Sequence, residues 1–297
     1  GDGSPLYTLA VAVDDVLMKV THVLRGEDLL SSTPRQIRVY QAMGLALEDY
    51  PVFAHLPFVM GQDNAKLSKR NGEVSIAWYR DKGFLPEAIC NYLALLGWSP
   101  GDDRENVTMK ELTELFTVEK VHSSPARFDM KKLEAINGDK IRALTIDEFL
   151  DWSLPFLTKA GVVSGSADEI ALVKLALPLI QERIIMLSEV PAMLKFLFVK
   201  NFAVEADSVS KITDDASKQV LERSLKELEP LATWTHESIE AALRSSLIEE
   251  MGLKPRIAFG AVRIATTGST ISPPLFESME LLGKEASLAR IRAGIKL

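Results

Sequence analysis

Apolar residues recur at helical spacing from Ser75 to the end of the 297-residue chain, and this constrains the fold more than any other feature. Thr108 with Glu111, and Thr145 with Glu148, have the spacing of a capping box, in which each side chain bonds the other residue's backbone N–H. The chain is therefore predicted to be mainly α-helical, with a domain boundary near residue 145. Predicted helices cover 75–82, 86–96, a segment from 108, a segment that ends at Asn137–Gly138, and five or six segments between 150 and 297, with apolar stripes at Leu172, Leu175, Ala176, Leu179, Ile180 and at Ile239, Ala242, Leu243, Leu247.

The first 60 residues follow a different pattern. Runs that favour β-structure cover 7–13, 16–24 and 52–60, and Thr33–Pro34 begins a helix that Gly44 ends. This order predicts part of a parallel, doubly wound sheet, in which ligands bind beyond the carboxyl ends of the strands. The charged residues Arg25, Glu27 and Asp28 follow the second run. Three strands and one helix cannot cover both faces of such a sheet, so we expect half of this domain to lie upstream.

The third run leads into a basic stretch, 66–70, with the sequence Lys-Leu-Ser-Lys-Arg. Turn-forming residues flank it, which predicts an exposed loop. Three cations and one hydroxyl can together bind a polyanion such as a triphosphate. A solvated basic loop is the alternative, and the short motif alone would favour it.

Composition limits the cellular environment and the ligands that are expected for the chain. No apolar run is as long as the roughly 18 residues that a membrane helix needs. Cys90 is the single cysteine, which excludes a disulfide framework, fits a reducing cytoplasm and is expected to be buried and inert. A net charge of −7 argues against a generally basic nucleic-acid coat but permits a local basic track. The four histidines are scattered, so no protein-bound metal is expected, and Trp78, Trp98, Trp152 and Trp234 are expected in the core.

Several stretches together resemble the bacterial glutamyl-tRNA synthetases, which are class I aminoacyl-tRNA synthetases. The resemblance covers nearly the whole chain and thins between about 150 and 255, and the HIGH-type motif of that family is missing. The stretches that carry it are 5–7, 13–15, 21–28, 32–36, 53–57, 66–70, 83–88, 91–99, 124–129, 137–138, 263–268, 273–277 and 282–285.

The resemblance implies roles for individual residues. Lys69 would stabilise the charge that develops on the α-phosphate of ATP, with Asp28, Val59, Lys66, Leu67, Ser68 and Arg70 as further ATP-binding residues. Tyr7 and Arg25 would hold the amino acid, and magnesium would accompany ATP. From the residues alone, Arg25 could instead form a salt bridge with Glu27 or Asp15, Val59 could be a core strand residue, and Asp28 a carboxylate at a helix start.

The same resemblance divides the chain into the carboxyl-terminal part of a catalytic domain (1–77), a helical domain that contacts the tRNA stem (78–144) and a helical anticodon-binding region (145–297). Arg183, Lys195 and Lys200 are the candidate tRNA-binding cations, although each alone could be a solvated surface residue. The implied enzyme is a monomeric, cytoplasmic ligase that joins glutamate to tRNA(Glu) through a glutamyl-adenylate; the chain alone would be inactive.

Three alternatives stay open. One is a non-catalytic tRNA-binding module derived from the synthetase. Another is the short paralogue that glutamylates a modified tRNA base, although that type lacks a long helical carboxyl half. The third is an inert helical scaffold, which would not need the lysine loop. The sequence does not decide whether tRNA(Gln) is also charged.

Overall fold

The computed structural model describes residues 2–61, 75–122, 124 and 126–297. The chain divides into two units, one formed by 1–79 and 86–136 and the other by 80–85 and 137–297. The lysine loop at 66–70 lies outside the described residues. Within them, no helix is long and apolar enough to span a membrane. The three-part division at 77 and 144 stays a prediction.

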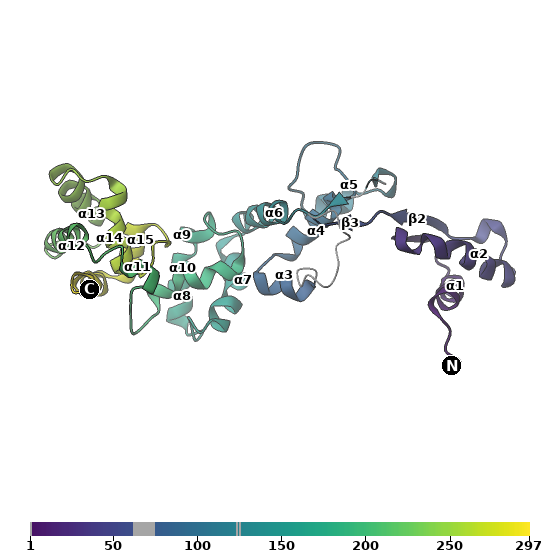
Figure 1. Cartoon of the computed structure of the whole chain (residues 1–297), viewed down its shortest axis with the longest axis horizontal. Coiled ribbons are helices and arrows are strands. Elements are labelled where there is room, and N and C mark those ends of the chain that lie inside the picture. The colour runs from purple at the N-terminus through teal and green to yellow at the C-terminus, as the bar shows by residue number, and fades with distance from the viewer. Residues whose placement is uncertain (1, 62–74, 123, 125) are drawn as a thin grey trace. The chain divides into compact units, whose positions relative to one another are not determined.

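The first unit begins with a small parallel sheet covered by helices on one face (Figure 1). In the described part, β1 (His22–Gly26) pairs with β2 (Val52–Leu56), so that Val23 lies opposite Phe53 and Arg25 opposite His55. Leu24 and Val52 point to the other face and are 48% and 59% exposed, respectively. The other elements of this portion are α1 (Tyr7–Leu17), the 3-10 helix η1 (Glu27–Ser32), α2 (Thr33–Ala42) and η2 (Leu47–Asp49).

None of the three expected strands has its predicted extent. The run 16–24 forms a strand only from His22, because residues 16–17 complete helix α1. Residues 7–13 belong to helix α1, whose buried Ala12 faces the protein interior and which packs on α2. The hydroxyl of Tyr40 donates a hydrogen bond to Asp15 at 3.0 Å and joins the two helices. This tertiary contact outweighs the β-favouring composition of the run. The run 52–60 is broken at Pro57, which lacks an N–H for a sheet, and β3 (Val59–Met60) pairs instead with β4 (Ala126–Arg127).

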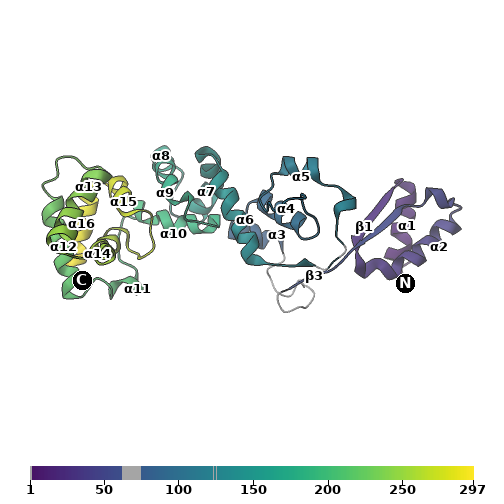
Figure 2. The ribbon, with the colours of Figure 1, turned by 90° about the horizontal axis from the view of Figure 1, so that it is seen from above.

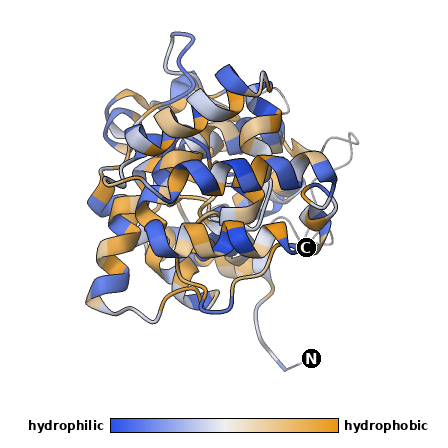
Figure 3. Ribbon diagram, turned by 90° about the vertical axis from the view of Figure 1, so that its left-hand side faces the viewer, coloured by the Kyte–Doolittle hydropathy of each residue, from blue (hydrophilic) through white to orange (hydrophobic). Residues whose placement is uncertain are grey.

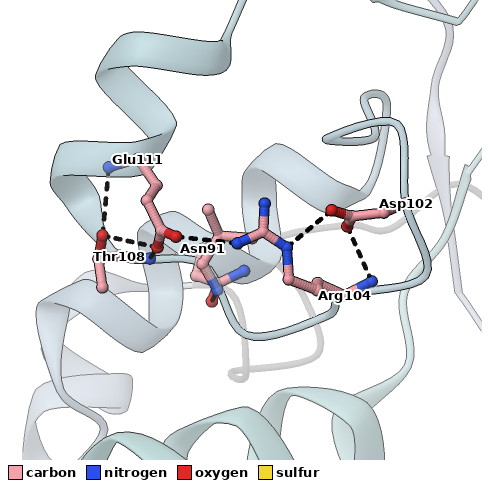
Figure 4. Close-up of polar contacts among 6 residues, drawn as sticks. Asn91, Asp102, Arg104, Thr108 and Glu111 are labelled. Atoms are coloured by element: carbon pink, nitrogen blue, oxygen red, sulfur yellow. Dashed lines mark hydrogen bonds and ion pairs between the residues drawn. The ribbon is translucent and has the colours of Figure 1, made fainter.

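The remaining elements of the first unit are helical and follow the predicted caps. They are α3 (Ile76–Lys82, of which residues 80–82 are assigned to the second unit), α4 (Pro86–Leu95), α5 (Met109–Leu115) and η4 (Val118–Lys120). The capping box of Thr108 and Glu111 is confirmed, and Glu111 also binds Arg104, which in turn binds Asp102 (Figure 4). The buried Asn91 accepts from the backbone N–H of Val107 at 2.8 Å and holds the same loop.

Three other expectations were wrong, two of them because the side chain faces a different side of its helix and the third because distant segments bind the helix. Cys90 is exposed, because Ala88, Asn91 and Tyr92 form the buried side of α4. Trp152 is 42% exposed. Helix α6 (Met130–Ala143) continues through Asn137–Gly138, because the amide of Asn137 binds other segments and a Cβ at Gly138 would lie 3.1 Å from Ile185.

The second unit is built from helices whose ribbons carry both hydrophilic and hydrophobic stretches (Figure 3). Helices α12 (Asp215–Leu228), α13 (His236–Leu243), α14 (Pro255–Thr267), α15 (Leu275–Leu282) and α16 (Lys284–Ile295) lie together (Figure 2). Their apolar side chains form a core that includes Leu221, Leu243, Val262, Met279 and Ile291. The capping box of Thr145 and Glu148 at the start of α7 is confirmed. The elements are α7 (Ile146–Lys159), α8 (Ala167–Ala176), α9 (Pro178–Gln181), η5 (Leu187–Glu189), α10 (Val190–Leu194), η6 (Lys195–Leu197), α11 (Ala206–Val209), α12 (Asp215–Leu228), α13 (His236–Leu243), the π-helix η7 (Arg244–Glu250), α14 (Pro255–Thr267), α15 (Leu275–Leu282) and α16 (Lys284–Ile295).

Candidate functional site

Arg25 lies near the carboxyl end of β1, and neutral groups hold its guanidinium. Its Nε donates to His55 Nε2 at 3.2 Å, and its Nη2 donates to Thr33 Oγ1 at 2.8 Å and to Gln36 Oε1 at 2.7 Å. The carbonyl of Leu29 accepts from the same Nη2 at 3.3 Å. The ring of Phe53 lies 5.5 Å from the guanidinium carbon. The partially buried side chain is therefore fixed in one orientation.

A salt bridge between Arg25 and Glu27 or Asp15 is not what the structure shows. Glu27 accepts from the backbone N–H of Phe58 at 3.1 Å, and Asp15 accepts from the hydroxyl of Tyr40. Burial, together with the contact to Asp15, raises the pKa of Tyr40 well above its usual range. Across the described ranges, Arg25 forms no ion pair with a carboxylate. Its positive charge is therefore not neutralised and can attract an anionic ligand.

The side chains that hold Arg25 were not predicted as functional. Thr33 was expected to cap α2, but its hydroxyl accepts from Arg25 and makes no capping bond. Gln36 lies one turn further along α2, on the same side of the helix as Thr33. The three-residue spacing of Thr33 and Gln36 was the sequence signal that could have shown that both side chains lie on one side of the helix. His55 could be placed only from the strand register, because it lies opposite Arg25 on β2.

The other substrate-site candidates lie at several places in the first unit. Tyr7 is the first residue of α1 and is 50% exposed. Asp28 lies in η1, and its Oδ1 would be 2.5 Å from a Cβ at position 26, so any other residue there would require the Asp28 carboxylate to move. Val59 in β3 lines an apolar cavity of about 540 Å³ together with Leu56 and Trp98. The structure does not bring Tyr7 or Val59 into contact with Arg25 through any hydrogen bond or ring contact among the described residues.

The three candidate tRNA-binding cations differ in their surroundings. Lys195 forms an ion pair with Glu205, and this contact contributes most to lowering the pKa of Glu205. Lys195 and Lys200 line one hollow of about 790 Å³. Arg183 lies near Arg263, whose pKa is lowered by burial and by repulsion from Arg183. Among the residues that the structure describes, Arg183 and Lys200 form no ion pair.

A metal held by the protein itself was not expected from the scattered histidines. In the described part of the chain, no three or more histidine, cysteine, aspartate or glutamate side chains are grouped so that they could hold a metal ion.

A parallel α/β portion with a cationic side chain near the carboxyl end of a strand, followed by a long helical region, fits the architecture of class I aminoacyl-tRNA synthetases. Two family models together match nearly the whole chain. Residues 1–135 match "tRNA synthetases class I (E and Q), catalytic domain", and residues 139–295 match "Anticodon binding domain". The chain belongs to the class I tRNA synthetases for glutamate and glutamine.

Curated relatives and solved structures agree with this family. A protein named glutamate--tRNA ligase from Saccharopolyspora erythraea is 51% identical over 298 residues, which cover 99% of this chain and 59% of the relative. A protein of the same name from Paenarthrobacter aurescens is 50% identical over 98% of this chain and 59% of its own length.

The crystal structure of a glutamate tRNA ligase from Elizabethkingia meningosepticum, in complex with its amino acid, aligns with a TM-score of 0.80 at 29% identity, covering 99% of this chain and 61% of that one. The chain thus spans about three fifths of the length of the proteins that it resembles.

Proposed function

We propose that this chain forms part of a ligase that attaches L-glutamate to tRNA(Glu) in the cytoplasm, using ATP with Mg²⁺ and passing through a glutamyl-adenylate. The observation that supports this most strongly is the order of the two matches, with a catalytic-domain match directly followed by an anticodon-binding match. Both curated relatives cited above carry the name glutamate--tRNA ligase.

In this proposal, Arg25 binds a carboxylate of glutamate and Tyr7 contacts the same substrate. The support for Arg25 is its fixed, unneutralised guanidinium, since a charge-assisted hydrogen bond to a carboxylate is stronger than one between neutral groups. Asp28 and Val59 contact the nucleotide. Lys66, Leu67, Ser68, Lys69 and Arg70 bind the phosphates, and Lys69 stabilises the charge that grows on the α-phosphate during adenylate formation.

The helical region binds the anticodon end of the tRNA, where single-stranded bases can be splayed out and read. Arg183, Lys195 and Lys200 contact its backbone. Because Lys195 is already paired with Glu205, we expect Arg183 and Lys200 to contribute more than Lys195.

Salt-dependent binding of tRNA(Glu) to the 297-residue chain tests this proposal. Binding should weaken by about 0.7 log units per log unit of salt for each single-strand phosphate contact. Replacing Arg183, Lys195 and Lys200 by alanine should weaken binding and flatten the slope. A variant that lacks Lys218, Lys226 and Lys296 removes the same charge elsewhere in the unit and serves as the control. Equal slopes for the two variants, or footprints confined to the acceptor stem, would contradict the assignment.

A non-catalytic tRNA-binding module is the second candidate, because the match of residues 139–295 to an anticodon-binding domain would be expected for such a module as well. Pyrophosphate exchange separates the two. A ligase that contains this chain should exchange pyrophosphate into ATP only when glutamate and tRNA are present, whereas a module would bind tRNA without exchange.

A further inference from the structure

The amide of Gln36 holds Arg25 and is itself buried. Its Oε1 accepts from Arg25 Nη2 at 2.7 Å, and the side chain is fully inaccessible to solvent. This contact fixes the orientation of the amide, because only the oxygen can accept from a guanidinium. Within the described residues, Gln36 Nε2 has no hydrogen-bond partner, which is unusual for a buried donor. The amide at position 36 is therefore kept although both of its N–H groups are unsatisfied among the residues that the structure describes.

Every group that accepts a hydrogen bond from Arg25 is neutral. They are the Leu29 carbonyl, the Thr33 hydroxyl, the Gln36 amide and the Nε2 atom of His55, which must be unprotonated to accept. A glutamate at position 36 would have nearly the same shape but would form an ion pair with Arg25. That pair would cancel much of the attraction of Arg25 for an anion. The difference between amide and carboxylate at this position thus controls the charge that a ligand meets.

Two of the three nitrogen atoms of the Arg25 guanidinium donate to the described residues of the protein, and the third does not. Nε and Nη2 are used by the groups named above, while Nη1 has no acceptor in the part of the chain that the structure describes. Three acceptors on Nη2 and one on Nε hold the guanidinium plane, and Nη1 is left to bind a ligand. Gln36 therefore positions Arg25 without occupying the nitrogen that a ligand would contact.

We propose that Gln36 is a positioning residue that orients Arg25 and preserves its net charge, so that the site favours an amino acid with a side-chain carboxylate over its neutral amide. This inference rests on the proposed function, in which Arg25 contacts the amino-acid substrate. Gln36 does not touch the substrate and acts only through Arg25.

The test replaces Gln36 by glutamate in a ligase that contains this chain. The measurements are kcat and KM in pyrophosphate exchange with glutamate, with glutamine, and with varied ATP. In the Gln36→Glu variant, the KM for glutamate should rise about tenfold or more while kcat and the KM for ATP change less than about threefold. The preference for glutamate over glutamine should fall by a similar factor. Gln41→Glu is the matched control, because Gln41 lies on the same helix and accepts from Arg38 at 3.1 Å but is exposed.

A second variant separates charge from orientation. Gln36→Met keeps the volume and the charge of Arg25 but removes one acceptor, so the KM for both amino acids should rise while their ratio is preserved. It also keeps the test decisive if Gln36→Glu does not fold. If the wild-type ligase is active and the Gln36 variants have the same KM for glutamate as the wild type, the role of Gln36 is overturned. An equal effect of Gln41→Glu would also overturn it. Absence of glutamate-dependent exchange in the wild-type ligase would instead overturn the proposed function on which it rests.

Discussion

The backbone N–H of Leu85 donates a hydrogen bond to Oδ1 of Asn137 at 2.8 Å, across 52 positions of sequence. The amide nitrogen of Asn137 donates to the carbonyls of Gly83 at 3.3 Å and Ile185 at 2.5 Å. The fully buried Asn137 thus joins helix α6 to the turn after α3 and to the segment before η5. One side chain satisfies backbone groups from two distant segments, which makes it a structural centre of the second unit.

Replacing Asn137 by alanine should therefore lower the free energy of unfolding by about 3 kcal/mol, because at least two buried backbone groups lose their partners. Urea denaturation followed by circular dichroism measures the change. Asn201→Ala is the control, since Asn201 is exposed and makes no hydrogen bond among the described residues. A loss below about 1 kcal/mol would show that water replaces the amide.

Alanine substitutions at Gly83 and Gly101 distinguish the effect of backbone strain from the effect of a steric clash. Both have positive φ, +86° and +97°, so alanine is strained at either position. A Cβ at Gly83 would lie 2.5 Å from the backbone nitrogen of Leu187, whereas a Cβ at Gly101 would meet no atom within 4 Å. Gly101→Ala should cost about 1 kcal/mol and Gly83→Ala at least twice as much. Similar midpoints in thermal unfolding for both variants would contradict the predicted clash.

Arg290 and Arg292 test the value of a buried against an exposed arginine on α16. Arg290 donates to the carbonyls of Thr266 at 2.7 Å and Phe196 at 2.8 Å, and lies 3.9 Å from the ring centre of Phe202. Burial lowers its pKa to about 10. Arg290→Met should destabilise by about 2–4 kcal/mol, because two buried carbonyls lose their donors. Arg292→Met breaks an exposed ion pair with Glu229 and should cost less than about 1 kcal/mol. Equal effects would be inconsistent with this account.

His236 should give the second unit a pH-dependent stability. Its Nδ1 lies 2.8 Å from Glu280 and its Nε2 lies 3.1 Å from Glu237, and the hydrogen bond to Glu280 is the largest cause of its raised pKa, with Glu277 a smaller one. Because the folded pKa is above the unfolded value of 6.5, this stabilisation is fully present below 6.5 and is lost as pH rises through the folded pKa. His236→Gln should therefore reduce stability in acid but not in alkaline solution, in urea titrations at several pH values. His122→Gln is the control, and an identical pH profile for wild type and His236→Gln would refute the prediction.

Lys69→Ala should slow adenylate formation by roughly 10² to 10³ in a ligase that contains this chain, as expected for loss of one donor to a developing charge. Glutamate affinity should change little, because the charge on the phosphate grows in the transition state. Pyrophosphate exchange gives the rate, and Lys19→Ala, an exposed lysine of the same unit, is the control. An unaltered rate would move the role to Lys66 or Arg70.

Local chemistry let the sequence by itself determine several features of this protein. The capping boxes at Thr108 and Thr145 formed as predicted, because both partners of each bond lie within one helical turn. The mainly helical character and the synthetase family also followed, since periodicity and short motifs are written along the chain. The position of Arg25 near the end of a strand was also predicted from the sequence.

Tertiary structure decided the features whose partners are distant in sequence. Helix α1 replaced an expected strand because it packs on α2, and α6 continued past Asn137–Gly138 because that amide binds residues 48 and 52 positions away. Periodicity alone could not show which side of its helix Cys90 or Trp152 occupies. The partners of Arg25 are decisive in the same way. A nearby carboxylate in the sequence suggested a salt bridge, but the strand register and helix packing brought three neutral side chains to the guanidinium instead, and only those contacts leave its charge available for a substrate.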